Sequence, residues 1–111
     1  MDWTSELSNA NTNLDAYRSV QPDTARGFST LHHAAMSEGE ISAKTKELMA
    51  LAIGIAKQCV DCIGFHVKAA VAAGATRREI EETVNVCVLM GGGPSFMYGV
   101  KALEAYDQLT A

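Results

Sequence analysis

Residues 47–66 read ELMALAIGIAKQCVDCIGFH. The segment from Leu48 to Ala56 is apolar around the whole circumference of a helix, which is typical of a helix buried between its neighbours. The segment that follows carries two thiols and an imidazole close together at the expected start of another helix. A helix can form without these residues. Thiols and an imidazole in this arrangement are the groups that thiol-disulfide or peroxide chemistry uses. We therefore expect two consecutive helices, the second of which carries a reactive site.

The reactive helix is expected from about Cys59 to Ala73, because Gly74 fits the left-handed position that ends many helices. Cys59 then lies near the N-cap and Cys62 in the first turn, where free peptide N–H groups and the helix dipole stabilise a thiolate. His66 lies one turn behind Cys62 on the same face, so it can take the proton of Cys62 or pair with its thiolate. Cys62 is the predicted nucleophile.

Two further residues modify this pair. Cys59 lies three residues before Cys62 on the same side of the helix, close enough for a short-loop disulfide, which is the geometry of a resolving thiol. Asp61 supports the helix from its first turn but disfavours a neighbouring thiolate. We expect the helix dipole and His66 to outweigh Asp61.

Glu47 borders the apolar run and shares a helical face with small residues such as Gly54, where another helix can approach closely. A carboxylate at such a position needs a partner or a proton. His66 is the predicted partner, which would complete a set of nucleophile, base and orienting acid. The alternative interpretation is an exposed first-turn acid flanked by Lys44 and Lys46.

Glu47, eleven intervening residues and then Cys-x-x-Cys-x-x-x-His resemble the signature of a known family. This is the alkylhydroperoxidase-D-like (AhpD-like) branch of the carboxymuconolactone decarboxylase family. The similarity extends from about residue 42 to residue 99 and includes the Gly74-Ala75-Thr76 turn with Glu79, Ile80 and Glu81. Cys-x-x-Cys alone is a weak motif, whereas its combination with His66 and a correctly spaced Glu47 is specific.

The resemblance implies an all-helical fold, assembly into a homotrimer or homohexamer, and reduction of organic hydroperoxides at the expense of an external dithiol, with no cofactor. It implies that Cys62 is the peroxidatic thiol that becomes a sulfenic acid and that Cys59 is the proton donor and resolving partner. It also implies that His66 and Glu47 form a proton relay. Some members carry a histidine immediately before the second cysteine, where this chain has Asp61. A relay through that side chain is therefore absent.

Two other kinds of function stay open. One is lactone decarboxylation, the chemistry of the family's decarboxylase branch, which does not depend on paired cysteines. The other is a noncatalytic redox-sensing or zinc-binding module. A structural zinc site needs four ligands, and Cys59, Cys62 and His66 supply three. His32, His33 or Cys87 could supply the fourth ligand only if the fold brought it close to the other three.

The composition favours a small cytoplasmic enzyme. At 111 residues the chain is expected to form a single domain over 1–111, with the core motif region at 42–99. A net charge of −4 without a basic cluster makes nucleic acid an improbable partner. Three cysteines, an odd number, suit a reducing compartment. The N-terminus lacks the pattern of a signal peptide, and no apolar stretch reaches the roughly 20 residues that span a membrane.

Helical periodicity and turn residues predict an all-α, compact domain of about six helices, with Cys-x-x-Cys at the N-terminus of a central helix. Ser42 is a predicted N-cap, and Thr76 with Glu79 is a predicted capping box. Cys87 lies on an apolar helical stripe and is expected to be a core thiol. The breaks between the helices are expected at Pro22, Glu38-Gly39, Lys57-Gln58, Gly74 and Gly91-Gly92-Gly93-Pro94.

Overall fold

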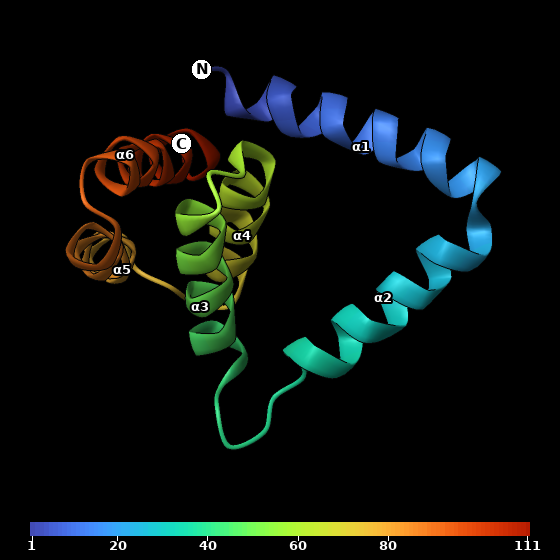
Figure 1. Cartoon of the computed structure of the whole chain (residues 1–111), viewed down its shortest axis with the longest axis horizontal. Helices are drawn as coiled ribbons and strands as arrows, with labels where there is room; N and C mark the ends of the chain where they lie inside the picture. The colour runs from blue at the N-terminus through green and yellow to red at the C-terminus, as the bar shows by residue number, and fades with distance from the viewer.

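Six α-helices joined by short turns make up the chain in the computed structural model, which describes residues 1–111 (Figure 1). They are α1 (Trp3–Val20), α2 (Pro22–Met36), α3 (Ala43–Ala56), α4 (Val60–Ala72), α5 (Arg77–Gly91) and α6 (Gly93–Leu109). The predicted all-α fold of about six helices is confirmed, and there is no β-strand. None of the six helices combines the length and the apolarity that crossing a bilayer would require.

The helix boundaries follow local chemistry that the sequence carries. Ser42 accepts a hydrogen bond from the N–H of Thr45 at the start of α3. Thr76 and Glu79 form the capping box of α5, in which each side chain accepts the backbone N–H of the other residue. Gly74, just beyond the end of α4, has the left-handed φ of +97° that the sequence predicts.

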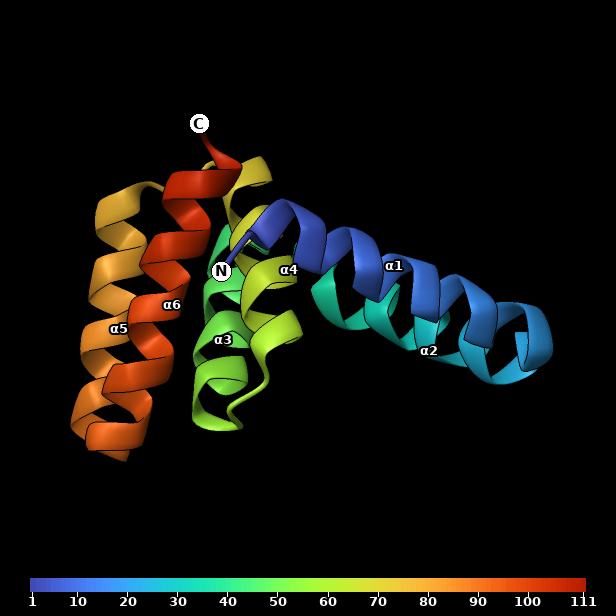
Figure 2. The same cartoon turned by 90° about the horizontal axis from the view of Figure 1, so that it is seen from above.

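Helices α3 to α6 form the body of the molecule, and α1 and α2 form an arm that projects from it (Figure 2). The α5–α6 pair packs against the α3–α4 pair. Leu51 and Ile55 of α3, Ile63 and Val67 of α4, and Ile80 of α5 are fully buried between the two pairs. Burial of such side chains contributes roughly 1.5–3 kcal/mol each, so this core holds the body together.

The arm is attached to the body by the first two turns of α1. Trp3 is fully buried, and its indole N–H donates a hydrogen bond to Glu104 of α6 over 2.7 Å. Trp3 and Leu7 pack so closely on α4 that a Cβ added at Gly64 would lie 2.7 Å from Leu7 and 2.8 Å from the Trp3 ring. Only glycine at residue 64 permits this approach.

Beyond Leu7 the arm leaves the core. Leu14 and Tyr17 are exposed, although their spacing with Trp3 and Leu7 predicts one inward face. Helix α2 contains no buried residue at all. Isolated helices of this length are marginally stable in water.

One expectation for α3 is wrong in the isolated chain. The run from Leu48 to Ala56 is apolar on all sides, but its Met49 and Ile53 side chains are 48% and 55% exposed. The face with Leu51 and Ile55 packs into the body. The other helices of the chain leave the Met49 and Ile53 face exposed.

The α1–α4 contact can be tested by adding one methyl group. Gly64→Ala should lower the free energy of unfolding by about 1–3 kcal/mol, because the Cβ overlaps Trp3 and Leu7. Gly27→Ala in α2 is the matched control, since a Cβ there meets nothing within 4 Å and should stabilise the helix by about 0.5–1 kcal/mol. Urea unfolding of both variants measures the difference, and equal effects would contradict the close approach.

Candidate active site

The turn between α3 and α4 places the first cysteine. The N–H of Gln58 donates to Ile55 O (3.0 Å), and the N–H of Cys59 donates to Gly54 O (2.9 Å). These two hydrogen bonds form a Schellman motif, which satisfies the last carbonyl groups of a helix. The motif needs a left-handed residue, and here that residue is Gln58 with φ +57°. Cys59 is therefore fixed in position by the end of α3.

Cys59 also begins α4. It is the N-cap, and its Sγ accepts the N–H of Cys62 at 3.3 Å. The two cysteines are joined as a disulfide with their Cα atoms 5.2 Å apart. Cys62 is the third residue of α4, so the positions predicted for the pair at the start of this helix are both confirmed.

Helix α3 passes directly behind Cys62. A Cβ at Gly54 would lie only 3.2 Å from the Cβ of Cys62, so the two helices are nearly in backbone contact at this point. Glu47 lies about two turns before Gly54 on the same side of α3, and His66 lies one turn after Cys62 on α4. The helix crossing thus brings Glu47 toward His66.

Glu47 and His66 are in direct contact. Oε2 of Glu47 lies 2.8 Å from Nδ1 of His66, and Glu47 is only 9% exposed. The alternative interpretation of Glu47 as an exposed acid is wrong, since Lys44 pairs with Glu79 and Lys46 donates to Ser37 O instead. A carboxylate on Nδ1 holds the neutral ring in the tautomer whose Nε2 accepts protons, which is the form that a general base needs.

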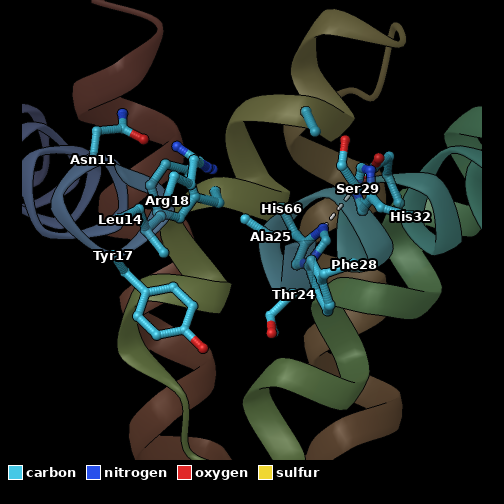
Figure 3. Close-up of a pocket in the computed structure, with 13 residues that line it drawn as sticks. Asn11, Leu14, Tyr17, Arg18, Thr24, Ala25, Phe28, Ser29, His32 and His66 are labelled. Carbon is cyan, nitrogen blue, oxygen red and sulfur yellow. Dashed lines mark hydrogen bonds and ion pairs between the residues drawn. The ribbon is translucent and has the colours of Figure 1, made fainter. Parts of the chain in front are cut away.

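A cleft opens beside this contact, between the arm and the body (Figure 3). Its volume is about 790 Å³. Its apolar and aromatic side chains come from the arm and from α4. Glu47 and His66 also line it, together with polar side chains of the arm such as Asn11, Arg18 and Thr24. The lining side chains include Leu14, Tyr17, Ala25, Phe28, Phe65 and Ala69.

A smaller hollow of about 410 Å³ adjoins the cleft on the side of the disulfide. Asp61 and Cys62 line it together with Ala10 and Asn13 of α1. Leu14, Phe65 and His66 line both spaces, so the imidazole is reachable from each. Cys62 is half-buried and open to a small molecule in the smaller hollow.

No hydrogen bond or ion pair joins the third thiol or the other two histidines to this set. Cys87 of α5 is buried, as the sequence predicts, and its S–H donates to Ala52 O. Burial raises the pKa of the Cys87 thiol above its ordinary value. His32 lines the cleft from α2, and the ring of His33 packs edge-on against the ring of His32. No group of three or more His, Cys, Asp or Glu side chains is arranged to hold a metal ion.

Sequence reasoning missed several contributors to the site. Phe65 lines both the cleft and the smaller hollow, and its place immediately before His66 is the signal that could have identified it. Leu14, Tyr17 and Phe28 have the spacing of apolar residues on amphipathic helices, and they line the cleft. Nothing local indicates this, because it depends on where the arm lies.

The fold and the site define a class of protein. Its members are all-helical, with a cysteine pair at a helix N-terminus and a buried carboxylate–imidazole contact. The sequence profile of the carboxymuconolactone decarboxylase family matches residues 22–105. The chain belongs to this family.

Two solved structures and a sequence relative are similar to this chain. The chain is 44% identical to apo-lpg0406, a carboxymuconolactone decarboxylase family protein from Legionella pneumophila, with a TM-score of 0.95 and full coverage of both chains. It is 28% identical to TM1620, a family protein from Thermotoga maritima, with a TM-score of 0.83 over 95% of this chain and 90% of that one. Protein H16_B0147 of Cupriavidus necator is 36% identical over 99% of this chain and 97% of its own length.

The three thiols should differ in reactivity. After reduction, iodoacetamide at neutral pH should alkylate Cys59 and Cys62 in the folded protein, whereas Cys87 should react at least about 10-fold more slowly because burial raises its pKa and restricts access. Peptide mass spectrometry at timed intervals measures each rate. Urea-unfolded protein is the control, in which Cys87 should react like the others. Equal rates in the folded state would contradict the buried position of Cys87.

Proposed function

We propose that this protein is a thiol-dependent peroxidase of the AhpD-like branch, which reduces organic hydroperoxides through Cys59 and Cys62. The observation that carries the proposal is the 2.8 Å contact between Glu47 and His66, one helical turn behind a cysteine that is already paired with a second thiol. The three groups correspond to a nucleophile, its base and an orienting acid. The Thermotoga maritima relative carries a suggested link to an antioxidative response.

The reaction begins with reduced cysteines. His66 accepts the proton of Cys62, and the thiolate attacks the outer oxygen of the hydroperoxide. The O–O bond breaks and Cys62 becomes a sulfenic acid. The departing alkoxide takes a proton from Cys59 or from a water and leaves as the alcohol. Glu47 stabilises the imidazolium that forms on His66.

The resting dithiol is then restored in two steps. The Cys59 sulfur attacks the sulfenic acid, water leaves, and the Cys59–Cys62 disulfide forms. An external dithiol reduces this disulfide by exchange and is itself oxidised to a disulfide. The observed pairing of the cysteines corresponds to the oxidised state of this cycle.

The cleft suits the organic part of the substrate. Its walls carry Leu14, Tyr17, Phe28 and Phe65, and it meets the smaller hollow at His66. A hydroperoxide with an apolar or aromatic group could place that group in the larger space and its O–O bond beside Cys62. We accordingly expect bulky organic hydroperoxides to be better substrates than hydrogen peroxide.

The proposal also includes assembly of several copies, as a homotrimer or homohexamer. Helix α2 has no buried residue, and its Phe28 and Leu31 are exposed. On the opposite part of the molecule, Leu89 and Met90 of α5 are 80% and 79% exposed. Single chains rarely leave so much apolar surface in water. We place the assembled enzyme in the cytoplasm, whose reducing conditions suit a dithiol cycle.

Peroxidase activity can be measured directly with cumene hydroperoxide under dithiol recycling. Cys62→Ser and Cys59→Ser should each abolish turnover, and His66→Asn should lower kcat/KM by about 100-fold because the base is lost. Cys87→Ala is the matched control and should keep turnover. No turnover by the wild type, with both thiols titratable after reduction, would reject the peroxidase.

Lactone decarboxylation is the second candidate, because the family profile bears that name. The two activities respond differently to one variant. Cys59→Ser should leave a lactone decarboxylase active and should inactivate a dithiol peroxidase.

Assembly can be tested by light scattering of the wild type and of Leu89→Glu. The wild type should have three or six times the mass of one chain, and Leu89→Glu should dissociate it, because a charge would be buried in the interface. Thr4→Glu introduces the same charge at an exposed position of α1 and should leave the mass unchanged. A wild type with the mass of one chain would contradict the proposed assembly.

A further inference from the structure

The cleft between the arm and the body carries more basic than acidic side chains. Arg18 and His32 line it from the arm, and His66 lines it from α4. Glu47 is the only acid among the lining residues, and it is already bound to Nδ1 of His66. The whole chain has the opposite balance, with 13 acidic and 9 basic residues. A cleft whose one acid is occupied and whose arginine is not favours an anionic ligand.

Arg18 has donors that the fold leaves unused. Leu14, Tyr17 and Arg18 share one face of α1, and all three line the cleft (Figure 3). Nη1 of Arg18 donates to Asp15 over 2.8 Å, which is the one hydrogen bond of this guanidinium group. Because the two side chains are 54% and 75% exposed, this pair contributes little and can give way to a ligand. A guanidinium group has five N–H donors in a planar fork that matches a carboxylate.

Further polar groups of the arm line the same cleft without a partner. The hydroxyl groups of Thr24 and Ser29 and the side-chain amide of Asn11 take part in no hydrogen bond within the protein. Each can donate a hydrogen bond to a ligand oxygen. The arm therefore supplies one cation and several neutral donors to a space whose other side chains are apolar or aromatic.

The positions along α1 separate the anionic end of such a ligand from the cysteine pair. Leu14 lines both the cleft and the smaller hollow that contains Cys62, whereas Arg18 lines the cleft alone. Arg18 lies one turn beyond Leu14, roughly 6 Å farther along the helix axis. In this direction α1 runs away from the body (Figure 2). A ligand that reaches both Arg18 and Cys62 must therefore carry its anion and its reacting group at separate positions on an apolar body.

We propose that the cleft binds a carboxylate with an apolar or aromatic body, that Arg18 pairs with the carboxylate group, and that the substrate reduced at Cys62 is a hydroperoxide of such an acid. Thr24 and Ser29 offer additional hydrogen bonds to its oxygen atoms. The choice of a hydroperoxide rests on the proposed function, whereas the carboxylate site itself does not.

Binding is tested by NMR titration with phenylbutyrate and with the neutral phenylbutanol, which has the same apolar body. Arg18→Gln should raise the Kd of phenylbutyrate about 10-fold, because a charge-assisted hydrogen bond is lost, and should leave the Kd of phenylbutanol within about twofold.

Arg26→Gln is the matched control for this titration. Arg26 forms the same kind of i,i+3 ion pair, with Asp23, but it does not line the cleft. The control removes the same charge from the arm and should keep the parent's Kd for phenylbutyrate. Equal weakening by the two variants, or no saturable binding of phenylbutyrate to the wild type, would overturn the carboxylate site.

Turnover adds a second measurement, with linoleic acid hydroperoxide and its methyl ester as the two substrates. The wild type should prefer the acid by about 10-fold in kcat/KM, and Arg18→Gln should lose this preference. Turnover of both compounds without a preference would reject the carboxylate site and keep the peroxidase. Binding of phenylbutyrate that depends on Arg18, with no turnover of either hydroperoxide, would keep the site and reject the peroxidase.

Discussion

The crossing of α3 and α4 at Gly54 controls the geometry of the whole site. No side chain separates the helices there, so the Cβ of Cys62 approaches the backbone of α3. The chain turns back between the two helices, and residues that precede Gly54 therefore face residues that follow Cys62. Glu47 and His66 meet at 2.8 Å as a result. A Cβ at residue 54 would lie only 3.2 Å from the Cβ of Cys62, so this close helix crossing depends on glycine.

The site also lies at the boundary between two differently built parts of the molecule. The body supplies the thiols, the imidazole and the carboxylate on well-packed helices, whereas the arm supplies most of the apolar wall of the cleft. Trp3 joins the two parts through its burial and its bond to Glu104. The thiols with the Glu47–His66 contact and most of the apolar cleft wall are thus carried by separate elements, so exposed side chains of the arm can differ without altering the groups on the body.

Much of this arrangement could be predicted from the sequence, because its causes are local. Ser42, Thr76 and Gly74 mark helix ends by hydrogen bonds or by φ, and Cys62 and His66 are neighbours in one helix whatever the tertiary fold. The Glu47–His66 contact was predicted from charge burial and from the family resemblance together. The arm could not be predicted, because Leu14 and Tyr17 have the spacing of core residues although no core lies beside them.

Cys59 has two structural duties, since its N–H completes the cap of α3 and its sulfur caps α4. The turn between α3 and α4 therefore cannot gain or lose a residue without disturbing one of these two caps. Inserting or deleting one residue at Lys57 or Gln58 would turn α4 by about 100° around its axis relative to α3. Cys62 and His66 would then face away from Glu47, although every helix could still form. Length variation within this family should accordingly be confined to other connections, such as residues 37–42, and strictly absent from this turn.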